Sequence, residues 1–162
     1  MAEAFPVPVR ITRVSTDFPL SAVRYFYTVE VPDGRPYIGN AELMVFPVSA
    51  KRDDDYFRDV FAFSFNELIG SGLHPTSIIA FLRKFYPNGE GTEESLEGFT
   101  RKGVGSGVLE HLVSDALQLG AVGMYVRTYS TSMKTFLAER HGFVPFDAKV
   151  PAQYANRWHR AL

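Results

Sequence analysis

The chain has 162 residues, the length of one domain with a core of its own. Its 17 lysine and arginine residues nearly balance its 18 aspartate and glutamate residues, and the net charge of −1 excludes the basic field that drives general nucleic-acid binding. The absence of cysteine excludes disulfides, thiolate nucleophiles and cysteine-ligated metals. Because no signal-peptide pattern follows Met1 and no stretch approaches about 18 apolar residues, we expect a cytoplasmic protein with no membrane partner.

The first half of the chain predicts strands. Apolar and polar residues alternate over 7–11 and lose this phase at Val14, which predicts a strand that ends or bulges near Arg13. A run of strand-forming residues begins at Arg24, and a Pro-Asp-Gly turn and a return strand follow it. We therefore expect a hairpin over 24–48.

The segment between this hairpin and the middle of the chain is less clear. A phenylalanine at every second position favours a strand over 60–66, although the apolar spacing over 57–68 also fits a helix. Prolines on both sides of the next apolar run predict a helix over 75–85. A short strand is expected over 95–99.

The second half has a clearer pattern. Apolar residues recur every four positions after Gly103 and predict a helix that ends at Gly120. A strand is predicted next, over 122–128, so strand, helix and strand occur in the order of a parallel crossover. Ser130 or Thr131 then caps a second predicted helix.

The closing part of the chain continues this pattern. The second helix is predicted to reach Arg140, with Gly142 as its stop. Two closing strands are predicted over 143–146 and 153–162. The sequence shows no repeat, low-complexity tract or linker, so we expect one domain over 1–162.

Three glycines, Gly103, Gly105 and Gly107, lie at the start of the first of these helices. A phosphate loop needs glycines because the backbone approaches its ligand closely, and it needs a following helix to aim free N–H groups. The Walker pattern is absent, and Arg127 stands where a dinucleotide fingerprint needs an acid. Two interpretations stay open: a phosphate cradle, or a tight turn whose glycines serve geometry alone.

Three segments together carry a resemblance to a known family. Thr100 to Gly105 is similar to the pyrophosphate loop of the GCN5-related N-acetyltransferase (GNAT) superfamily, which reads Gln/Arg-x-x-Gly-x-Gly/Ala at the start of a long helix. Leu137 to Phe143 resembles the helix end that runs into Gly-Phe in that family, and Arg157 to Arg160 resembles its closing strand. The resemblance covers about 93–162.

The resemblance implies an α/β (α+β) fold. It is a single GNAT-like domain with a central, mixed and largely antiparallel twisted sheet of about six to seven strands, flanked by helices. In this interpretation 93–162 is the cofactor-binding half. The half over 1–92 is divergent, with an insertion over about 69–92.

The resemblance also implies a function, which is acyl-CoA-dependent N-acyl transfer. In its simplest form an unidentified primary amine attacks acetyl-CoA directly. The pyrophosphate would lie on backbone N–H groups of the glycine-rich segment, and the pantetheine arm along the strand before it. The cofactor-binding residues implied are Leu96, Gly98, Phe99, Arg101, Lys102, Gly103, Val104, Gly105, Ser106 and Gly107.

Direct attack needs a base for the amine and a proton for the departing thiolate. Glu97, Glu94 and Glu67 are candidate bases, because the family often places a glutamate on its fourth strand. Tyr129 is the candidate acid. We expect no metal, because the four histidines are scattered and show no ligand spacing.

Two departures from the family pattern favour an alternative function. Thr100 replaces the first residue of the loop motif, and Ala138 stands where many members carry a tyrosine that protonates the thiolate. The alternative is a catalytically silent module of this fold that binds CoA or a protein partner. A third hypothesis is an interaction protein that uses its phenylalanine-rich surface. A homodimer is also an expectation, because the final strands of such folds often pair.

Overall fold

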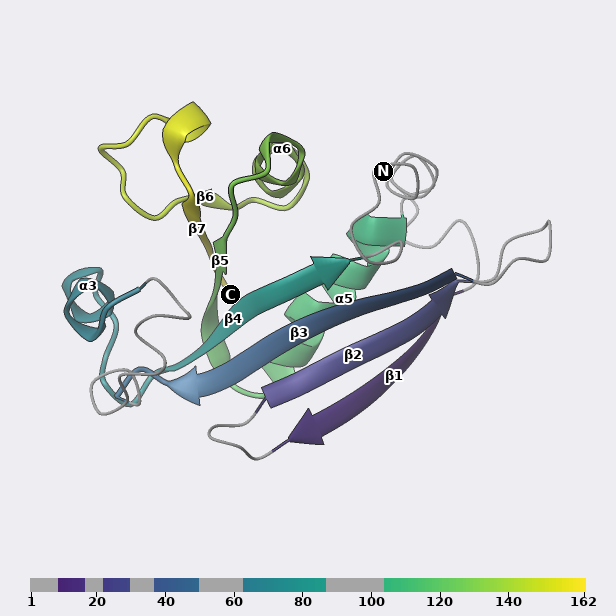
Figure 1. The fold of residues 1–162 in the computed structure, drawn as a ribbon. Helices are drawn as coiled ribbons and strands as arrows, with labels where there is room; N and C mark the ends of the chain where they lie inside the picture. The colour runs from purple at the N-terminus through teal and green to yellow at the C-terminus, as the bar shows by residue number, and fades with distance from the viewer. Residues whose placement is uncertain (1–8, 17–21, 30–36, 50–62, 87–103) are drawn as a thin grey trace. The chain divides into compact units, whose positions relative to one another are not determined.

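The computed structural model describes residues 9–16, 22–29, 37–49, 63–86 and 104–162 (Figure 1). The fold is α+β, with one open mixed sheet and helices. The chain divides into two compact units, each built from two separate segments. The first unit combines 1–44 with 84–115, and the second combines 45–83 with 116–162.

The first unit contains an antiparallel ribbon. β1 (Val9–Thr16) pairs with β2 (Ala22–Val29), and β2 pairs with β3 (Tyr37–Pro47), which confirms the predicted hairpin. The predicted end of the first strand near Arg13 is wrong. β1 reaches Thr16 because its ladder with β2 continues without a register shift, so strand pairing outweighs the change of apolar phase at Val14.

α5 (Val104–Gln118) lies largely in the first unit and confirms the predicted helix. Its apolar positions form the expected stripe, since Val108, Leu109, Leu112 and Ala116 are each at most 1% exposed. The helix ends as predicted, because Gly120 adopts φ 90° and thereby allows the chain to turn into the next strand.

The second unit holds strands in the order β4-β5-β7-β6. β4 (Ile78–Tyr86) pairs in parallel with β5 (Ala121–Arg127). β7 (Arg157–Ala161) is antiparallel to β5 and to the short β6 (Val144–Pro145). Both closing strands were predicted, but the second begins at Arg157 and not at 153, because a 3-10 turn precedes it. The described residues of this unit also form α3 (Phe65–Gly70), α6 (Thr131–Arg140) and a 3-10 turn, η1 (Ala152–Tyr154).

Two predicted elements of this unit are wrong. The segment expected as a helix over 75–85 is the strand β4, since its apolar run is buried in the sheet beside β5 and has no exposed face to alternate with. A strand was predicted over 60–66, of which 60–62 lie outside the described residues. The helix α3 begins at Phe65 instead. Ser64 caps this helix by accepting a hydrogen bond from the Glu67 N–H at 3.1 Å.

The core of the second unit is well filled. Trp158 is 2% exposed, and its indole Nε1 donates to the carbonyl of Ala155 at 3.1 Å. Leu137 of α6 is fully buried, and its carbonyl accepts from the N–H groups of His141 and Phe143 where the helix ends. Among the described residues no helix is long and apolar enough to cross a membrane.

Candidate functional site

The first candidate site is the start of α5. The helix begins at Val104, so Gly105, Ser106 and Gly107 form its first turn instead of a loop before it. The first four N–H groups of an α-helix have no acceptor within the helix, and this first turn holds no acidic residue. The turn therefore suits an anion such as a diphosphate. The other predicted cofactor residues (Leu96, Gly98, Phe99, Arg101, Lys102 and Gly103) and Glu97 lie outside the described residues.

The second candidate site lies in the second unit, beside a cluster of aromatic side chains. Tyr125 of β5 lies opposite Phe81 of β4 and His159 of β7 in the strand registers. Phe63 and Phe146 pack edge-on at 5.0 Å between ring centroids and each contacts Tyr125. We call these five residues the aromatic cluster. Burial raises the pKa of the Tyr125 phenol and lowers the pKa of the His159 imidazole.

Arg157 borders this cluster and is held on several sides. Its Nη1 and Nη2 donate to Oε1 and Oε2 of Glu67 at 2.9 and 2.7 Å. Its guanidinium also lies 5.3 Å from the ring centroid of Phe63 and 5.1 Å from that of Phe146. The hydrogen bonds from Arg157, together with the N–H of Ser64, lower the pKa of Glu67 to about 2.

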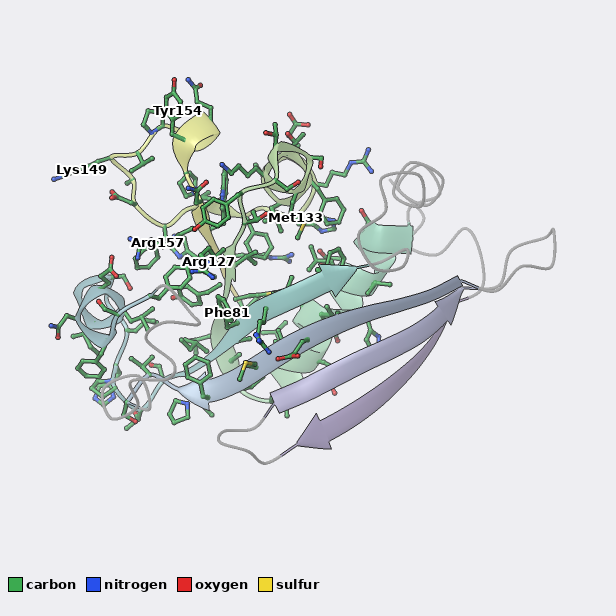
Figure 2. The ribbon with its side chains drawn as sticks, viewed as in Figure 1. Phe81, Arg127, Met133, Lys149, Tyr154 and Arg157 are labelled. Atoms are coloured by element: carbon green, nitrogen blue, oxygen red, sulfur yellow. The ribbon has the colours of Figure 1, made fainter. Side chains whose placement is uncertain are left out.

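Arg127 lies directly opposite Arg157 in the β5–β7 ladder, and Figure 2 shows their side chains close together. Both arginines border a hollow of about 310 Å³, which we call the arginine pocket. Tyr129 and Tyr154 also line it and are 71% and 68% exposed. The remaining lining residues are Asp147, Val150, Ala155 and Asn156.

The arginine pocket brings together some predicted residues and not others. Tyr129, the predicted acid, lines it. Glu67 does not line it, and its carboxylate is poorly suited to accept a proton, because the ion pair with Arg157 stabilises the charged form. Ala138 is exposed on α6 and has no proton to donate.

The two arginines of the pocket are candidate site residues that the sequence patterns did not indicate. Arg127 and Arg157 both lie on predicted strands, so the sequence allowed the two arginines to face one another. No sequence signal set the register that brings Arg127 opposite Arg157. Asp147 and Asn156 lie outside the strands and gave no motif at all.

Comparisons with protein-family models, with curated proteins and with solved structures find no match.

Proposed function

We propose that the protein is an acyl-CoA-dependent N-acyltransferase that, most simply, transfers an acetyl group from acetyl-CoA to a primary amine. The observation that carries this proposal is the order of β4, α5 and β5. The two strands are parallel, and the helix between them in sequence begins with a turn that contains Gly105 and Gly107. A GNAT-like sheet of about six to seven strands is part of the proposal.

In this proposal the backbone N–H groups of the first turn of α5, from Val104 to Gly107, hold the diphosphate of acetyl-CoA. Arg101 and Lys102 add positive charge, and the segment around Leu96 to Phe99 lies along the pantetheine arm. The amine nitrogen forms a bond to the thioester carbonyl carbon, the carbon–sulfur bond breaks, and the products are an amide and free CoA. The amine loses one proton and the thiolate gains one.

Taken within the second unit alone, the arginine pocket is a candidate binding place for the acceptor. Tyr129 lines it at the end of β5 and carries a phenol that supplies the proton for the thiolate. Glu97 stays the predicted base, because Glu67 is engaged by Arg157. The phenol of Tyr129 would then take the place of the family tyrosine that is absent at Ala138, and the departing thiolate would still receive its proton.

One observation favours the alternative, a module that binds CoA without turnover. Neither the ion-paired Glu67 nor Ala138 supplies acid–base chemistry. The two functions share coenzyme binding and differ only in turnover, so one pair of measurements separates them.

The test measures acetyl-CoA binding by calorimetry and thiol release in the presence of a panel of primary amines. Tyr129→Phe should lower the acyl-transfer rate by about 10² or more. Arg140→Gln is the control, because it changes an exposed residue of α6 that does not line the pocket. Binding without thiol release with any amine would establish the silent module, and no heat with any CoA species would refute both functions.

A further inference from the structure

The arginine pocket carries two opposite charges that do not neutralise one another. Arg127 and Asp147 both line it. Among the described residues, no ion pair joins Arg127 or Asp147 to a charged partner. Oδ1 of Asp147 accepts a hydrogen bond from the backbone N–H of Lys149 at 3.1 Å. A hollow lined by a cation and an anion that form no ion pair with any described residue suits a ligand that carries both signs.

The strand register makes Arg127 a strong anion site. Like charges directly opposite one another in an antiparallel ladder destabilise the pair. Glu67 balances Arg157 through its two hydrogen bonds, and no such carboxylate faces Arg127 in the described part of the chain. An oxyanion bound to Arg127 would balance the second arginine of the pair and would receive charge-assisted hydrogen bonds in a planar fork.

The other lining groups fit a small organic molecule. The phenols of Tyr129 and Tyr154 offer hydrogen bonds and apolar faces, while Val150 and Ala155 are apolar. The Oδ1 atom of Asn156 accepts from Lys134 Nζ at 2.8 Å, so its amide hydrogens are the groups left for a ligand. At about 310 Å³ the pocket is at the lower end of the usual range for small-molecule sites.

We propose that the arginine pocket binds a small zwitterion of the α-amino-acid type, with its carboxylate on Arg127 and its ammonium group on Asp147. The binding itself needs no acyl transfer. We further infer that this zwitterion is the acyl acceptor, and this part of the inference rests on the proposed function.

The test uses the full chain and measures binding by ¹H–¹⁵N chemical-shift titration with the common α-amino acids. The amino acid that binds most tightly is then compared with its carboxamide, which lacks the negative charge, and with its deaminated acid, which lacks the positive charge. Each of these two probes should bind at least about tenfold more weakly than the amino acid.

Variants locate the two charges. Arg127→Gln should weaken amino-acid binding about tenfold or more but leave carboxamide binding nearly unchanged. Asp147→Asn keeps an acceptor for the Lys149 N–H and should weaken binding of the amino acid but not of the deaminated acid. Arg140→Gln is the matched control, because Arg140 is exposed in the last turn of α6 and does not line the pocket. Unfolding midpoints of all variants report whether they are folded.

The inference is overturned if no amino acid causes shifts at pocket residues, or if either probe binds as tightly as the amino acid. It is also overturned if inorganic phosphate binds more tightly than every amino acid and CoA displaces it better than dephospho-CoA, because the pocket then serves a coenzyme phosphate. Amino-acid binding without thiol release would refute the proposed function alone. A different outcome would refute this inference alone. In that outcome the protein acylates amines that carry no carboxylate, and Arg127→Gln has the same KM for the amine as the wild type.

Discussion

The ion pair between Glu67 and Arg157 joins residues 90 positions apart, and its removal can be isolated by one substitution. Glu67→Gln keeps an amide oxygen that accepts from the Ser64 N–H, so the cap of α3 survives. It loses the negative charge and places an amide NH₂ group against one guanidinium N–H donor. The variant therefore tests the bidentate pair and not the helix cap.

The expected cost follows from the exposure of the two partners. The side chains of Glu67 and Arg157 are 41% and 26% exposed, so solvent screens much of their attraction. Two charge-assisted hydrogen bonds, discounted for this screening, give a loss of about 1 to 2 kcal/mol in the free energy of unfolding at pH 7. Urea unfolding monitored by tryptophan fluorescence measures it, because Trp158 is buried in the same unit.

The pH dependence has a definite sign. The folded-state pKa of Glu67, about 2, lies below its ordinary value of 4.5, so the pair contributes its full stability above pH 4.5 and loses it as the pH falls toward 2. The difference between wild type and Glu67→Gln should shrink over that window. Glu139→Gln, at an exposed position of α6, is the control for the loss of one negative charge. Equal stability of wild type and Glu67→Gln at pH 7, or a gap that persists unchanged to pH 2, would refute the reasoning.

Two further substitutions probe the second unit. A Cβ added at Gly123 would lie 3.0 Å from Cε2 of Tyr125, whose ring is held in the aromatic cluster, so Gly123→Ala should destabilise the fold by about 1 to 3 kcal/mol in urea unfolding. Ser130→Ala removes the acceptor for the Met133 N–H at the start of α6 and should cost about 1 kcal/mol, measured in the same way.

Matched controls exist for both substitutions. Gly70→Ala adds a Cβ that meets nothing within 4 Å and should leave stability unchanged or slightly raised. Ser114→Ala changes an exposed serine within α5 and removes no cap, so it should not be destabilising. If Gly123→Ala were as well tolerated as Gly70→Ala, the close packing of the Tyr125 ring over the glycine would be refuted.

The helices and strands of the second half were predictable because their signals are local. α5 has an apolar stripe and α6 has a serine cap, and a glycine follows each of them. β4 was not predictable in this way. Ile79, Ala80, Phe81 and Leu82 are all buried, and a strand buried on both faces has no alternation that would distinguish it from a buried helix.

α3 shows a different kind of failure. The pattern of alternating phenylalanines suggested a strand, but Ser64 and Glu67 have the spacing of a capping box, which was present in the sequence and predicts a helix start.

The charged residues of the arginine pocket come from β5, β7 and the connection between β6 and β7. Their meeting depends on strand register and on long-range packing, and neither has a local signature.

The place of β7 between β5 and β6 has a consequence for synthesis of the chain. The ribosome synthesises β5 and β6 before β7, so neither strand can pair with β7 until that last strand is made. Until Arg157 to Ala161 leave the exit tunnel, β5 presents an open row of backbone donors and acceptors, which is the kind of edge that recruits foreign strands. A released chain that is truncated after Asn156 should therefore aggregate or bind chaperones far more readily than the chain that includes β7.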